Sequence, residues 1–306
     1  MSTSGKGFKT EINFENKNEF DEKVITKNSK SNFLYSFSLL SKEKNDAINT
    51  VYAFCRKTDD IVDNEEESKE DKFTRLQDWK SELANAIESG QSDNLLLGNV
   101  EKVIRTFKIP TKPFFELIEG MEMDLKKSRY NNLNELYEYC FKVASTVGLM
   151  SIEIFGYNNP MTREFAINLG IALQLTNIIR DIKTDADGGR IYIPMEDLRK
   201  FNYTESDLLE GRYNEKFINM MKYECERAKY FYEEADKSLQ NEDKGNMFPA
   251  KIMESIYFRL LKKIEANNYN VFEKKIRVSN IVKLMITAGI YLKYKLLYGS
   301  NENVQA

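Results

Sequence analysis

Residues that break helices are sparse in this chain, and that scarcity constrains its fold more than any other feature. Among 306 residues there are 14 glycines and five prolines, the prolines at positions 110, 113, 160, 194 and 249. Proline ends or kinks a helix and glycine weakens it, so long helical windows remain between these positions. Apolar residues recur in the windows at the 3.6-residue spacing of a core-facing helix, while the alternation of a strand is nearly absent. The sequence therefore predicts an all-α fold.

The connections between the helical windows are short, which predicts a single domain. We find no internal repeat and no linker long enough to separate a second domain, and 42% hydrophobic residues are ample for one large core. We expect a polar N-terminal tail over residues 1–20, one domain over 21–300 and a C-terminal tail over 301–306. The expected helices cover residues 39–62, 76–87, 95–107, 113–127, 133–155, 162–184, 215–239, 250–266 and 280–298.

The charge pattern and the residue inventory exclude several classes of function. The 45 basic and 48 acidic residues are interspersed, without a polybasic tract, so we expect no nucleic-acid partner. The chain has no histidine, which removes Ser-His-Asp triads, HExxH zinc hydrolysis and imidazole base catalysis. Its three cysteines form no CxxC pair, so we expect neither a disulfide framework nor a zinc site. A cytoplasmic protein fits best, since we see no secretion signal or spanning segment.

Three aspartates, Asp59, Asp60 and Asp63, gather near the end of the first long helical window. In a helix Asp59 and Asp63 share a face because they are four residues apart, and Asp60 is offset toward the same rim. A bound divalent cation would reverse their mutual repulsion. Arg56, one turn earlier, would either neutralise the cluster or hold a phosphate through two hydrogen bonds. The alternative interpretation is an acidic helix end exposed to water.

A second polar stripe crosses a helical window that is otherwise apolar. Gln174, Asn177, Asp181 and Asp185 are spaced three, four and four residues apart, so they lie along one face, with Arg180 beside them. Polar groups on a buried face need partners, and carboxylate and amide oxygens are the ligands of a hard cation such as Mg²⁺. The alternative for this helix alone is a buried hydrogen-bond network. Two facing acidic clusters on long helices are harder to explain in that way.

Several further residues are candidates on weaker grounds. After Asp185 a glycine-bearing turn leads into an extended apolar segment, which is either an ordinary connection or a flap over a metal site, with Arg190 available to a departing diphosphate. Lys274 and Lys275, in a basic run near the C-terminus, are either solvated turn residues or anion contacts. Tyr139 and Tyr257 lie in helical windows rich in apolar residues, where a tyrosine is more often core than catalytic.

Taken together, these motifs make the chain resemble the squalene/phytoene synthase family, the head-to-head prenyl synthases, over nearly its whole length. The resemblance is carried by Tyr52-Ala-Phe-Cys-Arg-Lys-Thr-Asp-Asp-Ile-Val-Asp63, Tyr139-Cys-Phe-Lys-Val-Ala-Ser-Thr-Val-Gly148, Leu173-Gln-Leu-Thr-Asn-Ile-Ile-Arg-Asp181 and Gly189-Arg-Ile-Tyr-Ile-Pro194. Within the family, the chain is most similar to bacterial presqualene diphosphate synthases of the hopanoid pathway at Gly120-Met-Glu-Met-Asp124-Leu, Ile152-Glu-Ile-Phe-Gly-Tyr157 and Glu196-Asp-Leu198.

The resemblance implies the isoprenoid synthase helical bundle, in which the two acidic motifs face each other across a central apolar cavity. The positions that it implies for Mg²⁺ are Asp59, Asp60, Asp63, Asn177, Asp181 and Asp185. Those that it implies for substrate diphosphate are Arg56, Gln174, Arg180, Arg190, Tyr257 and Lys274, with Tyr139 near the reacting carbons. Two positions depart from the family pattern, since Thr184 replaces a glutamate of the second motif and Lys274 stands where some relatives have arginine.

The activity that the resemblance implies is a prenyl transfer between two molecules of farnesyl diphosphate, assisted by Mg²⁺, that gives presqualene diphosphate and releases diphosphate. The alternatives on the same scaffold are phytoene, dehydrosqualene or squalene synthesis. An alternative of another class is a non-catalytic assembly homologue, although intact acidic motifs argue against it. The sequence leaves open the prenyl chain length, the oligomeric state, peripheral contact with the inner face of a membrane and contact with downstream squalene-pathway enzymes.

Overall fold

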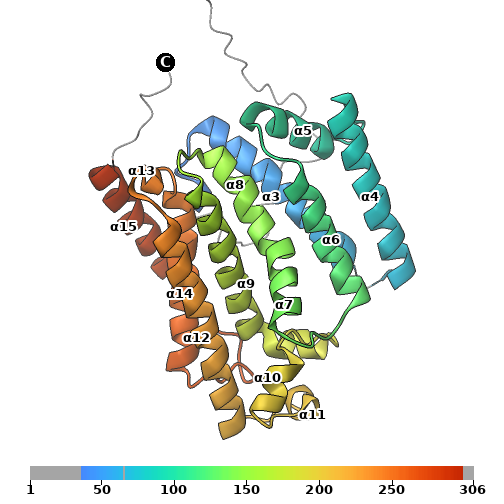
Figure 1. The fold of residues 1–306 in the computed structure, drawn as a ribbon, viewed down its shortest axis with the longest axis vertical. Coiled ribbons are helices and arrows are strands. Elements are labelled where there is room, and N and C mark those ends of the chain that lie inside the picture. Colours follow the sequence, from blue (N-terminus) through green and yellow to red (C-terminus); the bar gives the residue numbers. More distant parts are fainter. Residues whose placement is uncertain (1–35, 65, 299–306) are drawn as a thin grey trace, which may run out of the picture.

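The structure, a computed structural model, describes residues 36–64 and 66–298 and consists there of packed helices without a strand (Figure 1). The predicted all-α, single-domain class is thereby confirmed, while the predicted tails at 1–20 and 301–306 lie outside the described residues. The helices of the first half are α3 Lys42–Asp63, α4 Lys69–Ser89, α5 Leu95–Phe107, α6 Lys112–Lys126, α7 Leu133–Cys140, the π-helix η1 Phe141–Ser145 and α8 Thr146–Phe155. Those of the second half are α9 Met161–Asp187, α10 Met195–Lys200, α11 Glu205–Leu209, α12 Glu215–Ser238, α13 Asn241–Lys244, α14 Phe248–Ala266 and α15 Asn280–Tyr298.

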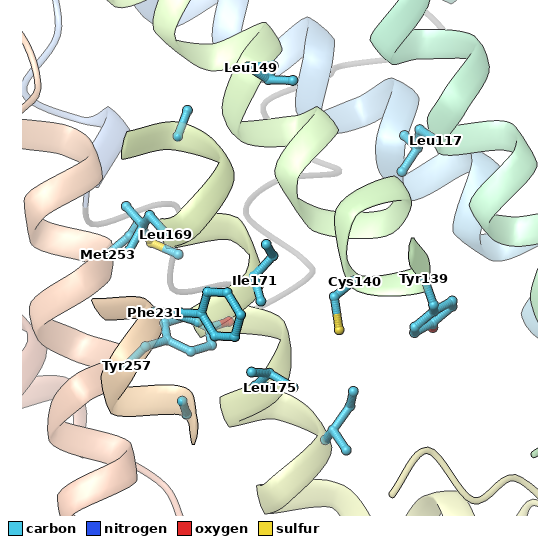
Figure 2. Packing of buried hydrophobic residues seen from close by; sticks show 14 of the residues in the cluster. Leu117, Tyr139, Cys140, Leu149, Leu169, Ile171, Leu175, Phe231, Met253 and Tyr257 are labelled. Atoms are coloured by element: carbon cyan, nitrogen blue, oxygen red, sulfur yellow. The ribbon is translucent and has the colours of Figure 1, made fainter. Parts of the chain in front are cut away.

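The long helix α9 forms the centre of the bundle, in contact with η1, α8, α12 and α14. Thirteen of its residues are buried, most of them aliphatic, as expected for a helix surrounded by others. Figure 2 shows Ile171 and Leu175 of α9 between Tyr257 of α14 on one side and Cys140 of α7 on the other. The polar stripe predicted on α9 therefore belongs to a helix that the surrounding core holds rigidly.

The prediction of one continuous helix over 133–155 is wrong in its interior. That segment is α7, then the five-residue π-helix η1, then α8. The π-helix lies where the chain crosses α9 at very close range: the Ser145 hydroxyl donates to the Ile167 carbonyl of α9 at 2.8 Å, and Gly170 of α9 lies against the backbone of Ser145. A π-helical turn is a common irregularity at sites where a helix must adapt to a neighbour.

The helix α3, which carries the first acidic cluster, is fixed against α4. The ring of Phe54 stacks on that of Trp79 with centroids 5.7 Å apart, and the Trp79 indole donates to the Thr58 hydroxyl at 3.0 Å. Both contacts involve buried side chains of α3, Phe54 and Thr58, that lie within the two turns before Asp59. The C-terminal end of α3 is therefore held in place by packing rather than by the acids themselves.

The segment after α9 is extended, as predicted, and pairs with the connection that follows α6. The amide of Ile191 donates to the Ser128 carbonyl at 2.9 Å and that of Met195 to the Tyr130 carbonyl at 2.8 Å. These bonds place Arg190 and Tyr192 beside the C-terminal ends of α6 and α9. Across the described part of the chain, none of the helices is both long enough and apolar enough to cross a lipid bilayer.

Candidate active site

The first acidic cluster lies at the C-terminal end of α3, where the chain's own arginine binds it. The guanidinium of Arg56 lies 2.8 Å from a carboxylate oxygen of Asp59 and 2.8 Å from one of Asp60. Burial and then the negative charge of Asp63 raise the pKa of Asp59 to about 6, against the opposing effect of Arg56. The contribution of Asp63 to this raised pKa means that the crowded carboxylates repel one another. A bound cation would relieve the same repulsion, so the raised pKa indicates a candidate cation site.

The second cluster lies along the C-terminal half of α9. Arg180 donates from Nε to Asp181 Oδ1 at 2.9 Å, and Lys275 Nζ lies 2.9 Å from the same oxygen. Burial alone would raise the pKa of Asp181, but the bonds and charges of these two cations outweigh it and hold the pKa below its usual value. One turn later, burial and then the charge of Asp181 raise the pKa of Asp185 to about 7.

The two clusters are linked through Arg190. The Arg190 amide donates to the Asp185 carbonyl at 2.8 Å, and its guanidinium lies 3.7 Å from Asp63 Oδ1 on α3. A narrow hollow beside the second cluster is lined by Asp185, Arg190 and Tyr192 together with apolar residues of α9, α11 and the extended segment. The candidate residues from α3 and α9 thus meet at one end of the bundle.

Sequence reasoning named Asp124, the last acidic residue of α6, only within a subfamily motif and missed it as a site residue; its charge acts on both clusters. Its Oδ2 accepts a hydrogen bond from Tyr139 at 2.9 Å and its Oδ1 accepts one from Tyr192 at 2.8 Å. Its negative charge contributes to the raised pKa values of both Asp59 and Asp185. No spacing rule links α6 to α3 and α9, because only the tertiary fold brings Asp124 beside them.

Tyr139 is held by this carboxylate in a small aromatic stack. Its ring lies 5.0 Å from that of Tyr192, centroid to centroid, and 5.4 Å from that of Tyr130. Burial, followed by the charge of Asp124, raises the pKa of Tyr139 well above the ordinary value of a tyrosine. Tyr139 is therefore a neutral hydrogen-bond donor, which argues against a tyrosinate base at this position.

The predicted diphosphate contacts lie around the second cluster. Gln174 accepts a hydrogen bond from the Asn177 amide at 3.4 Å, and the buried Tyr257 of α14 contributes to the electrostatic environment of Arg180. Lys274 lines a basic hollow together with Lys263, Lys275, Ile276, Arg277 and Asn267. Because Lys275 reaches Asp181, this hollow adjoins the acidic stripe. The sequence indicates Lys275 as a basic candidate beside Lys274, although only Lys274 is among the expected diphosphate contacts.

The donor set fits Mg²⁺ in its chemistry, although the side chains as they lie do not form a ready cage. Among residues 36–64 and 66–298, no three Asp or Glu side chains come close enough together to hold an ion. Instead, lysine and arginine side chains bind the aspartates, as Arg56 and Lys275 do. Asn177 Oδ1 is buried without a hydrogen-bond partner, which is costly unless a cation or a donor reaches it. Carboxylate and amide oxygens are ligands that Mg²⁺ accepts.

Comparison with known proteins identifies the family. The squalene/phytoene synthase family profile matches residues 26–281. The chain is 37% identical over 259 residues to a chloroplastic phytoene synthase of Oncidium hybrid cultivar. The aligned region covers 83% of this chain but only 62% of the plant protein. It is 34% identical over 285 residues to the 15-cis-phytoene synthase of Synechocystis sp., covering 89% of this chain and 84% of that one.

A solved structure of a dehydrosqualene synthase in complex with ligand superposes with a TM-score of 0.78 at 29% identity, covering 89% of this chain and 95% of the other. The chain therefore belongs to the squalene/phytoene synthase family, the class of head-to-head prenyltransferases.

Proposed function

We propose that this protein joins two prenyl diphosphates head to head, with Mg²⁺ as the required metal, and releases one diphosphate. The observation that carries the proposal is the meeting of two carboxylate-bearing helices, α3 and α9, across Arg190. In a family whose members transfer prenyl groups, such a meeting of acids and cations suits a substrate with an anionic leaving group and a hydrocarbon chain. We assign the catalytic domain to residues 21–300 and expect the protein to act in the cytoplasm.

The ligands that we propose for Mg²⁺ are Asp59, Asp60, Asp63, Asn177, Asp181 and Asp185. When bound, the metal would supply positive charge that stabilises a departing diphosphate. Metal binding would also release Arg56 and Lys275 from their ion pairs with the aspartates. The residues that we propose for the diphosphates are Arg56, Gln174, Arg180, Arg190, Tyr257 and Lys274, with Lys275 added by its contact with Asp181.

The proposed reaction needs one group that accepts a proton and walls that exclude water. Two prenyl diphosphates give one cyclopropyl product, one diphosphate and one proton. Because Tyr139 is buried and neutral and already donates to Asp124, we assign proton acceptance to the released diphosphate. We assign to Tyr139 and Tyr192 the wall beside the reacting carbons, where their ring faces favour a developing carbocation.

For the product we propose presqualene diphosphate, formed from farnesyl diphosphate. Three segments support this choice by their similarity to presqualene diphosphate synthases, namely Gly120 to Leu125, Ile152 to Tyr157 and Glu196 to Leu198. A second candidate is phytoene synthesis from the longer geranylgeranyl diphosphate. It is favoured by the identities of 34 and 37% to proteins named phytoene synthase.

One assay separates these products. Purified protein is incubated with Mg²⁺ and labelled farnesyl diphosphate, or with geranylgeranyl diphosphate, in the absence of NADPH. We expect the C15 substrate to give a C30 cyclopropyl diphosphate. A C40 hydrocarbon from the C20 substrate, with no product from the C15 substrate, would establish the second candidate instead. No condensation of either substrate would overturn the proposed function itself and favour a non-catalytic assembly role.

A further inference from the structure

The last described helix, α15, is attached to the protein through one face only. Its two buried residues, Thr287 and Tyr294, lie two turns apart on that face. Next to them Tyr291 packs edge to face on Phe248 of α14, with ring centroids 5.6 Å apart. In Figure 1, α15 lies at the edge of the bundle beside α14, with no described helix on its outer side.

The outer face of α15 is apolar. Ile281, Met285, Leu292 and Leu296 are 73, 60, 56 and 83% exposed, and their spacing of four, seven and four residues places them along one stripe. Six of the thirteen large apolar side chains that are exposed in the described part of the chain lie on this single helix. Scattered exposed apolar residues are normal, whereas a continuous stripe of them marks an interaction surface.

The charges around the stripe indicate what would cover it. The helix contains three lysines and no acidic residue, and the exposed Lys293 and Lys295 project roughly a quarter turn to either side of the stripe. The end of α14 and the connection that follows it add the basic hollow lined by Lys263, Lys274, Lys275 and Arg277. An apolar centre with lysine margins is the pattern of a helix that lies in the interface of a bilayer containing anionic lipids. If a second copy of the chain docked on the stripe, the lysines of the two α15 helices would lie near one another, and neither helix has an acidic residue to pair with them. This repulsion disfavours a dimer through α15.

The N-terminal turns of α15 feel the charge of a residue of the candidate active site. Burial, followed by the positive charges of Arg277 and Arg180, lowers the pKa of Lys283. Arg180 is the residue that donates to Asp181 in the acidic stripe of α9. The N-terminal turns of α15, where the stripe begins, therefore lie within electrostatic range of Arg180.

We propose that α15 docks the protein on an anionic lipid surface, inserting Ile281, Met285, Leu292 and Leu296 among the acyl chains while Lys293 and Lys295 contact lipid phosphates. The proposal rests on the proposed function for its purpose, because a prenyl diphosphate carries a hydrocarbon chain that partitions into a bilayer. Docking would present the site to a membrane-held substrate without any helix crossing the bilayer.

The test is co-sedimentation of the full chain with vesicles of phosphatidylcholine, alone or mixed with phosphatidylglycerol, in the absence of substrate. We expect binding to the mixed vesicles that weakens with salt. The double variant Leu292→Glu/Leu296→Glu should lower the partition coefficient by at least about tenfold for each leucine, because each loses its apolar burial and gains a repelled charge. The matched control Leu209→Glu/Tyr230→Glu adds the same charge at exposed apolar positions of α11 and α12 and should bind like the natural protein.

Turnover in detergent separates this inference from the proposed function. The α15 double variant should condense detergent-solubilised substrate at the natural rate, whereas Asp181→Ala should lose turnover and still bind vesicles. Equal vesicle binding by the natural protein and the α15 variant would overturn the docking proposal, as would a natural protein that ignores both kinds of vesicle.

If the double variant does not fold, two further measurements test the docking of α15. Leu292→Trp should shift its fluorescence emission to shorter wavelength when mixed vesicles are added, and an unchanged spectrum would count against insertion. Sedimentation velocity should show the same oligomeric state for the natural protein and Leu292→Trp. A dimer that this substitution dissociates would assign the stripe to a second copy of the chain and overturn the lipid assignment.

Discussion

The close approach of α9 to η1 depends on Gly170, and replacing this glycine with alanine tests the geometry on which the site is built. A Cβ atom at position 170 would lie 2.6 Å from Ser145 Cα, 2.7 Å from Ser145 N and 2.9 Å from the carbonyl carbon of Ala144. Carbon atoms in good contact lie about 3.5 to 4.0 Å apart. All three neighbours are backbone atoms, so no side chain can rotate away and the helices would have to separate by roughly 1 Å.

The size of the effect follows from two opposing terms. Overpacking a core typically costs about 1 to 3 kcal/mol, and the upper end applies because rigid backbone meets the new methyl group. Alanine in place of glycine inside a helix returns about 1 kcal/mol. We therefore expect Gly170→Ala to lower the free energy of unfolding by about 2 kcal/mol. The matched control is Gly289→Ala in α15, where no atom lies within 4 Å of the added Cβ, and it should stabilise by up to about 1 kcal/mol.

Urea unfolding followed by far-UV circular dichroism measures both variants, and turnover reports on the site. Displacing η1 by roughly 1 Å also moves Tyr139 relative to α9, and a misplacement of that size can lower kcat by as much as about 100-fold. Gly289→Ala should keep the natural kcat. If Gly170→Ala proves as stable as Gly289→Ala, the close crossing of α9 and η1 is wrong, and with it the relative placement of Tyr139 and Asp181.

Three further predictions concern individual side chains. Asp181→Ala should lower kcat by at least about 100-fold while the circular dichroism spectrum stays unchanged. An active variant would show that the reaction does not require the second cluster. Asp124→Asn weakens the charge-assisted bonds to Tyr139 and Tyr192, so kcat should fall by about tenfold to 100-fold with little change in KM, and unchanged kcat would remove these bonds from the mechanism. Burial raises the pKa of Glu254 to about 7, above its unfolded value, so its stabilising contribution is present at acidic pH and is lost as the pH rises toward 7. Glu254→Gln should therefore flatten the dependence of the unfolding free energy on pH between about 5 and 7, and an identical pH profile would refute the assignment.

The sequence predicted the parts of the site that local spacing controls. Asp59 and Asp63 share a face of one helix and Asp181 and Asp185 share a face of another, because residues four apart always do so in a helix. The extended segment around Arg190 was likewise visible in its glycines and in the proline that ends it. Family resemblance then supplied the expectation that the two helices face each other, which no spacing within one helix contains.

What the sequence could not predict depends on contacts between helices. Asp124 lies on α6, and only the packing of α6 beside α3 and α9 brings its carboxylate to Tyr139 and Tyr192. The π-helix inside the window 133–155 arises where η1 meets Gly170, a contact between segments far apart in the chain. The outward apolar face of α15 was equally hidden, because its amphipathic pattern fits either a packed helix or one that lies on a lipid surface.

Crystallography can test whether α3 and α9 jointly hold divalent metal around a diphosphate. Crystals of the protein with Mn²⁺ and an unreactive thiodiphosphate analogue of farnesyl diphosphate would be measured at the manganese absorption edge. We expect anomalous peaks within bonding distance of Asp59 or Asp63 on one side and of Asn177, Asp181 or Asp185 on the other, with Arg56 and Lys275 displaced from the aspartates. A bound analogue with no anomalous peak at either helix, and with those ion pairs intact, would contradict joint metal binding by α3 and α9.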